Sequence, residues 1–182
     1  MSSAILGVLL LNYTEKRWPN IQEALIGSLF VLASSGSILL LATNPHNSEQ
    51  LKELLVSQIL WVSYEQIIPV SILYAVILSI WFGLARQASS LRFYLLFAVT
   101  ITVSVQLVGV YLVFASLILP ALAIRTLSKF QLGYGYIIGG MGYTIGLILA
   151  AILDMPAGAM IVYSLALCAI LAGFFLKIQK TN

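Results

Sequence analysis

Long uncharged apolar runs follow one another along this chain, separated by short polar segments. The runs cover residues 21–43 (broken only by Glu23), 67–85, 93–124, 132–153 and 157–176. A helix needs about 20 apolar residues to cross a hydrocarbon core about 30 Å thick. Each run is therefore a candidate membrane span. The pattern predicts an all-α fold, a polytopic transmembrane helical bundle.

The segments between the runs are too short to separate domains. They read NYTEKRWPN, NPHNSEQLKE, RQASSLR, RTLSKFQ and DMP. Residues 1–182 are therefore expected to form a single transmembrane domain. The first apolar stretch, residues 1–12, lacks the features of a signal peptide and is too short to span a bilayer. The chain is therefore expected to begin partway through a helix.

Residues 93–124 form one run of 32 uncharged residues, which would make a helix of about 48 Å. A single crossing would place some of the Lys and Arg clusters outside, whereas these residues normally stay on the cytoplasmic side. A reversal near Gly109 gives two short traverses and keeps all four clusters inside. The clusters are Lys16/Arg17, Arg86/Arg92, Arg125/Lys129 and Lys177/Lys180. The reversal is preferred, and the single crossing stays open.

The external side on this topology contains residues 45–65, the turn near Gly109 and the segment around Asp154. Residues 51–66 are amphipathic and are expected at the membrane interface or dipping into the bundle. Trp18, Trp61 and Trp81 lie near predicted helix ends, as in an interfacial aromatic belt. With the reversal, the chain makes about six to seven traverses.

The composition excludes a soluble catalytic domain. The chain is 61% hydrophobic and 8% charged, whereas soluble domains carry about 25% charged residues. The net charge of +3 gives no reason to expect a nucleic-acid partner. Cys168 is the only cysteine, so no disulfide or thiolate cluster is available, and it is expected to pack in a core.

Motifs for ATP binding and for metal catalysis are also missing. The sequence has no Walker loop and no metal-spaced His/Glu pair, and its one histidine, His46, lies in a predicted loop. A solvated His46 is the simpler interpretation, and a passing metal contact is the alternative. We therefore expect no enzyme activity and no cofactor in this chain.

Three polar residues are candidates for a translocation pathway. Glu65 lies at the edge of an apolar run, where an ionisable group is costly unless it stays among the headgroups. Asp154 follows another run and either caps the next helix or stands at an external mouth. Gln106, preceded by Thr100, Thr102 and Ser104, either joins helices by hydrogen bonds or lines a polar path.

Small residues and a proline mark expected packing features. Two small-xxx-small pairs on one helix are formed by Gly135, Gly139, Gly142 and Gly146. This spacing permits close helix contact. Pro120 interrupts FASLILPALAIRTL and is expected to kink its helix.

Several stretches in order resemble a known family. They read EALIGSLFVLASSGSILLL, QLKELLVSQILWVSYEQI, VQLVGVYLVFASLILPALAIRTLSK and LGYGYIIGGMGYTIGLILAAILDMPAGAMIVYSLAL. Together they cover most of residues 20–176, and the last includes Asp-hydrophobic-Pro-x-Gly before its final helix. The chain resembles the membrane subunit of zinc, manganese and iron ABC transporters, which also reverses between VGV and LILPA.

The resemblance implies a permease of the type II importer class in the cytoplasmic membrane, moving divalent metal ions. It implies a second permease copy, a separate cytoplasmic ATPase and an external metal-binding protein as partners. The ATPase would dock on the loop between Arg86 and Arg92, although relatives carry a longer segment there of the type Phe-Ala-Arg-x-x-Gly. The family's first helices, with an Asp and a His that contact metal, have no counterpart. The chain therefore resembles the C-terminal two thirds of a permease, and no metal ligand is assigned.

Two other functions remain open at this point. An intramembrane enzyme acting on lipids or isoprenoids needs acids, His or Lys converging at one membrane depth. Glu65 and Asp154 are too isolated in the sequence to supply that cluster. A degenerate membrane subunit that assembles with partners without transporting is the other alternative.

Overall fold

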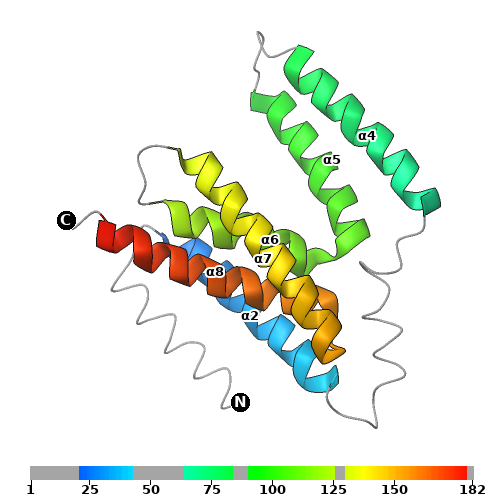
Figure 1. Ribbon diagram of the computed structural model, residues 1–182. Coiled ribbons are helices and arrows are strands. Elements are labelled where there is room, and N and C mark those ends of the chain that lie inside the picture. Colours follow the sequence, from blue (N-terminus) through cyan, green and yellow to red (C-terminus); the bar gives the residue numbers. More distant parts are fainter. Residues whose placement is uncertain (1–20, 43–63, 84–89, 126–129, 180–182) are drawn as a thin grey trace.

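The computed structural model describes residues 21–42, 64–83, 90–125 and 130–179, and nearly all of these residues lie in helices. The helices are α2 (Gln22–Ala42), α4 (Tyr64–Gly83), α5 (Ser90–Val108), α6 (Val110–Ile124), α7 (Gln131–Leu153) and α8 (Ala157–Gln179). No strand occurs in these ranges. Figure 1 shows the helices gathered into one bundle with a hairpin at its side. The predicted all-α helical bundle is confirmed.

The helices follow the apolar runs to within a few residues. Four of them are long and apolar enough to cross a bilayer: α2, α5, α7 and residues 157–174 of α8. The apolar part of α4, Ile67–Gly83, and the whole of α6 are shorter. Predictions for His46, for residues 1–12 and for most of residues 51–66 lie outside the described part of the chain, as do Trp18 and Trp61. Trp81 lies near the end of α4, as predicted.

Gly109 divides the long run of residues 93–124 into two helices. Its backbone angles are φ 88° and ψ 153°, in a region that is open only to glycine because other residues carry a Cβ. The N–H of Gly109 still bonds the carbonyl of Val105 at 2.9 Å, so α5 is intact up to the break. Figure 1 shows the chain changing direction there. The reversal that the charge pattern favours is therefore present in the fold.

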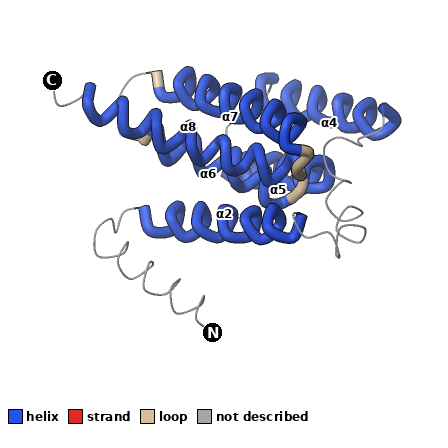
Figure 2. Tube along the Cα trace, turned by 60° about the horizontal axis from the view of Figure 1, so that its bottom comes forward, coloured by secondary structure: helices blue, strands red, loops and turns tan. Residues whose placement is uncertain are grey.

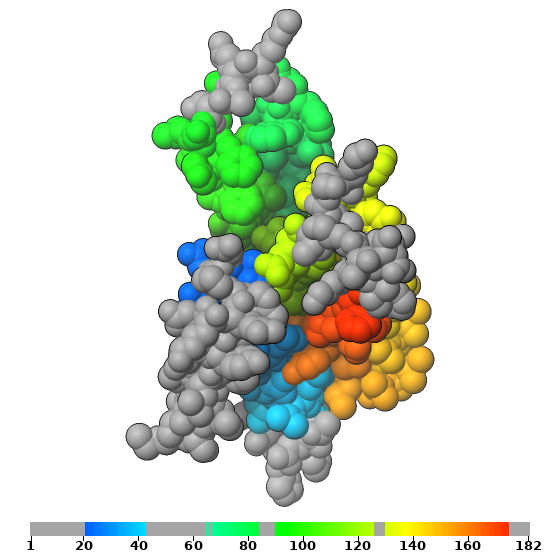
Figure 3. Space-filling view, turned by 90° about the vertical axis from the view of Figure 1, so that its left-hand side faces the viewer, coloured from blue at the N-terminus to red at the C-terminus, as the bar shows by residue number. Residues whose placement is uncertain are grey.

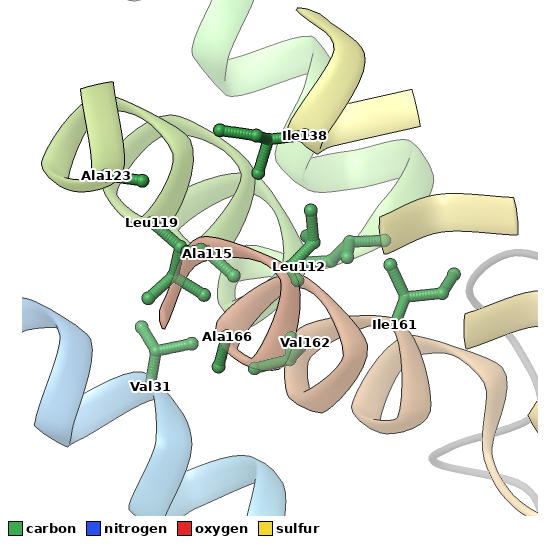
Figure 4. Packing of buried hydrophobic residues seen from close by; sticks show 11 residues of the cluster. Val31, Leu112, Ala115, Leu119, Ala123, Ile138, Ile161, Val162 and Ala166 are labelled. Atoms are coloured by element: carbon green, nitrogen blue, oxygen red, sulfur yellow. The ribbon is translucent and has the colours of Figure 1, made fainter. Parts of the chain in front are cut away.

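The buried core lies among four helices, with α8 at its centre. Apolar side chains of α8 meet those of α6, with Val31 of α2 and Ile138 of α7 completing the cluster (Figure 4). The cluster consists of Val31, Leu112, Ala115, Leu119, Ala123, Ile138, Ile161, Val162, Leu165, Ala166 and Ala169. In Figure 2, α6 and α8 lie between α2 and α7. Cys168 packs against this cluster half-buried, as expected for a core-type thiol.

The α4–α5 hairpin stands apart from this core. None of the side chains of α5 is buried, and those of α4 that the structure describes are exposed or half-buried. The hairpin joins the core through the contact of α5 with α6 at Gly109. Figure 3 shows its green atoms rising above the helices of the core. We call α2, α6, α7 and α8 the core bundle and α4 with α5 the hairpin.

Candidate functional site

The arginines of the described helices lie at one end of the molecule, where Glu23 in the first turn of α2 is also found. Arg92 lies in the first turn of α5 and Arg125 directly after α6. These positions lie at one end of the bundle, and the Gly109 break and the α7–α8 turn lie at the other (Figure 1). Glu65 and Asp154 are at this second end. The positions of Arg92 and Arg125 match the orientation that the positive-inside rule predicts, because the rule depends on Lys and Arg and acidic residues contribute little to it.

The three pathway candidates lie at the second end of the bundle, opposite Arg92 and Arg125. Glu65 is in the first turn of α4, Gln106 is three residues before Gly109, and Asp154 follows α7. All three side chains are exposed. The structure places them at one end of the bundle on three separate elements, and it does not bring them into one cluster.

Asp154 ends α7 through its backbone. It adopts a left-handed conformation with φ 52° and ψ 43°, and its N–H donates to the carbonyl of Ala150. The N–H of Met155 donates to the same carbonyl at 3.1 Å. This arrangement satisfies a carbonyl at the helix C-terminus that would otherwise have no partner. Asp154 is thus the C-terminal cap of α7, whereas the sequence suggested an N-terminal cap for the next helix.

A polar contact joins the two helices of the hairpin. The hydroxyl of Ser104 donates to the carbonyl of Thr100 at 2.8 Å. Since this uses the one proton of Ser104, the hydroxyl of Tyr74 donates to Ser104 across the 2.7 Å that separates their oxygens. Thr100 and Thr102 bond carbonyls of their own helix. Of the polar residues that precede Gln106, Ser104 is the one that joins helices.

Two of the four predicted packing glycines make the close contact between α7 and α8. A Cβ added to Gly146 would lie 2.5 Å from Cα of Ile161, and one added to Gly142 would lie 3.0 Å from Cα of Leu165. Backbone atoms this near leave no room for a side chain. The hydroxyl of Ser164 donates across the same contact to the carbonyl of Gly142. The predicted close packing is therefore found at Gly142 and Gly146.

The other predicted packing positions differ. A Cβ on Gly135 would lie 3.1 Å from the side chain of Ile124, whereas one on Gly139 would meet nothing within 4 Å. Gly139 is therefore not a packing glycine among the described residues. Pro120 is buried inside α6, and the helix continues past it to Ile124. The kink expected there stays a prediction.

A link between α8 and α2 was not predicted from the sequence. The hydroxyl of Tyr163 donates to the carbonyl of Leu32 at 3.1 Å. It reaches this carbonyl beside Gly36, where an added Cβ would lie 2.5 Å from the Tyr163 oxygen. A tyrosine within an apolar span is the signal that could have drawn attention to it, because a hydroxyl in an apolar environment is costly without a hydrogen-bond partner.

The predicted ATPase-docking loop is mostly outside the described residues. Arg86 lies in that part, and Arg92 is half-buried at the start of α5. Within the residues that the structure describes, no group of three His, Cys, Asp or Glu side chains could hold a metal ion. The site is therefore a set of separated polar positions on a membrane-spanning frame, without a metal-binding cluster in the described helices.

Comparison with known proteins gives one match. The family model described as the ABC 3 transport family matches residues 1–176. No curated protein and no solved structure matches the chain.

Proposed function

We propose, from the premise that this chain belongs to the ABC 3 transport family, that it moves divalent metal ions across the cytoplasmic membrane. The chain is a multi-pass ABC transporter permease. The family match over residues 1–176 is the observation that carries the proposal, since it covers every described helix up to residue 176. Zinc, manganese and iron are the candidate cargoes, as the motif resemblance suggests.

Energy for transport comes from a separate ATP-binding cassette subunit. The sequence has no Walker loop, so ATP hydrolysis belongs to that partner. In alternating access, ATP-driven motion of the partner changes the packing of helices and opens the path to one side at a time. We propose that an external metal-binding protein delivers the ion and that two permease copies enclose the path. The positions of Arg92 and Arg125 at the opposite end support an external end at Gly109 and Asp154.

Reconstitution tests the function directly. The full chain is co-expressed with a candidate ATP-binding cassette subunit from the same genome, purified through a tag on the ATPase, and placed in vesicles with ATP. Co-purification and ATP-dependent uptake of radioactive zinc, manganese or iron are expected. Co-purification without uptake of any of the three ions would favour the assembly-only subunit. A chain that binds no ATPase would refute the permease.

The docking loop is tested by a matched pair of arginine variants. Arg92 begins α5 beside the proposed loop, and Arg125 follows α6 at the same end of the bundle. Arg92→Ala is expected to reduce ATPase recovery, because it removes a cation next to the docking segment, and Arg125→Ala to leave it unchanged. If only Arg125→Ala reduces recovery, the segment after α6 is the docking site instead.

A further inference from the structure

Aromatic side chains gather at the cytoplasmic end of the hairpin. Trp81 lies in the last turn of α4, and Phe93, Tyr94 and Phe97 follow the start of α5. The ring of Phe93 contacts that of Trp81 across the two helices, with centroids 5.9 Å apart. Within α5 it also contacts Tyr94 at 5.6 Å and Phe97 at 5.7 Å. We call these four residues the ring cluster.

The ring cluster is open to its surroundings. Its members are between 45% and 66% exposed. Figures 1 and 3 show this end of the hairpin projecting away from the core bundle. Tyr and Trp favour the boundary between headgroups and hydrocarbon, because each has an apolar ring and one polar group. The ring cluster therefore indicates that the cytoplasmic end of the hairpin lies at that boundary, in contact with lipid.

Arg92, which directly precedes the ring cluster in α5, has no acidic partner in the hairpin. No Asp or Glu occurs anywhere in residues 66–153. Glu65 lies at the other end of α4, and Glu23 belongs to α2 in the core bundle. Among the described residues, Arg92 forms no ion pair, and its side chain is half-buried. The anions that a membrane boundary can offer to this guanidinium are lipid phosphates.

We propose that the cytoplasmic end of the hairpin binds an anionic phospholipid. The guanidinium of Arg92 donates hydrogen bonds to the phosphate oxygens, for which its planar fork is well suited. The glycerol and the upper acyl chains lie against the ring cluster. A free phosphate ion would gain nothing from exposed rings, whereas a phospholipid uses both parts of the surface. The cytoplasmic leaflet is the one that carries anionic lipids.

A lipid bound at this end supplies contacts that the protein does not. Since α5 buries no side chain, the hairpin depends on its surroundings for much of its packing. The lipid then holds the end of the hairpin that lies farthest from its joint with α6. This proposal goes beyond the transport function and does not depend on it.

The fluorescence of Trp81 tests the site. Trp18→Phe and Trp61→Phe leave Trp81 as the one tryptophan of the chain. The purified chain is placed, without an ATPase, in phosphatidylcholine vesicles that contain rising fractions of brominated phosphatidylglycerol or brominated phosphatidylcholine. Bromine quenches tryptophan on contact, so the quenching measures how often each lipid lies beside Trp81. Size-exclusion profiles confirm that each variant is folded.

Brominated phosphatidylglycerol is expected to bind beside Trp81 about fivefold more tightly than brominated phosphatidylcholine, which is the gain from one basic residue near anionic lipid. Arg92→Gln should abolish this preference. Arg92→Lys should retain part of it, because lysine keeps the charge without the planar fork. Arg125→Gln is the matched control and should retain all of it, because Arg125 belongs to the core bundle, away from the ring cluster.

Three results would overturn the site. They are equal quenching by the two lipids, a preference that survives Arg92→Gln, and a preference that Arg125→Gln abolishes as well. The last would mean that anionic lipid is attracted to the basic end of the protein in general. Because the vesicles contain neither ATPase nor metal ion, a negative result leaves the permease function and the docking role of Arg92 standing. Absence of uptake, in turn, leaves the lipid site standing.

Discussion

The core bundle and the hairpin are built from similarly apolar residues and pack very differently. In the core bundle, α8 is surrounded by α2, α6 and α7, and Ile161, Val162 and Leu165 are fully buried. In the hairpin, α5 buries no side chain. Two interactions join α4 and α5 among the described residues. One is the hydrogen bond between Tyr74 and Ser104, and the other is a contact between the rings of Trp81 and Phe93, whose centroids lie 5.9 Å apart.

The difference shows that hydrophobicity does not decide packing inside a membrane. Lipid tails are as apolar as leucine, so helices gain little by exchanging lipid for each other unless their surfaces fit closely. The core bundle has glycines at its closest contacts, whereas a Cβ on Gly83, the glycine of α4, would meet nothing within 4 Å. Small residues at contact positions, more than apolar character, distinguish the two regions.

The largest expected effect comes from filling the α7–α8 contact. Gly146→Ala puts a methyl group 2.5 Å from Cα of Ile161, so α8 must move. Overpacking of this kind costs about 3 kcal/mol, and the loss should appear as a lower free energy of unfolding in detergent. Gly139→Ala is the control, because its methyl group meets nothing within 4 Å. If both variants unfold alike, close packing does not stabilise the core bundle.

The second effect concerns the joint between the two regions. Gly109→Ala forces a Cβ into a backbone conformation that only glycine adopts freely, at a cost of about 2 kcal/mol. The hairpin is expected to change its position relative to α6, which distance measurements between spin labels on α4 and α8 would detect. Gly83→Ala lies at the open end of α4 and should change neither stability nor distance. An unchanged distance in Gly109→Ala would show that the joint tolerates other conformations.

Much of the fold could be predicted because membrane constraints act on composition. Twenty uncharged residues in succession predict a helix whatever its neighbours are. The division of residues 93–124 near Gly109 followed from the length of this run and from the positions of the four Lys and Arg clusters, since these residues are costly to translocate. Which helices touch could not be predicted, because apolar spans have no polar face to mark the buried side.

The site was less predictable because its contacts depend on helix rotation. The spacing of Gly135, Gly139, Gly142 and Gly146 indicates one face, yet only the last two meet the backbone of α8. The Tyr74–Ser104 bond joins residues 30 positions apart, and nothing in the sequence pairs them. The pathway roles of Gln106, Glu65 and Asp154 and the docking role of Arg86 and Arg92 remain predictions.

A smaller effect is expected from the polar bond inside the core bundle. Ser164→Ala removes the donor to the carbonyl of Gly142 and should lower the free energy of unfolding by about 1 kcal/mol. Ser79→Ala is the matched control, because Ser79 is exposed on α4 and bonds only its own helix, at Ala75. Equal stability of the two variants in detergent unfolding would mean that glycine packing alone holds α7 to α8.

The smallest effect tests whether the hairpin is a unit in its own right. Tyr74→Phe removes the hydroxyl that bonds Ser104, at a cost of about 0.6 kcal/mol. Since α4 contributes nothing to the buried cluster, the loss should appear as faster amide exchange in α4 with global unfolding unchanged. Tyr94→Phe, a change at an exposed ring of α5, should leave exchange unaltered.

Adding Ser104→Ala to Tyr74→Phe should cost little more, because the shared bond is already lost. Additive effects would show that the two hydroxyls act separately, and the hairpin would then lack its one polar link.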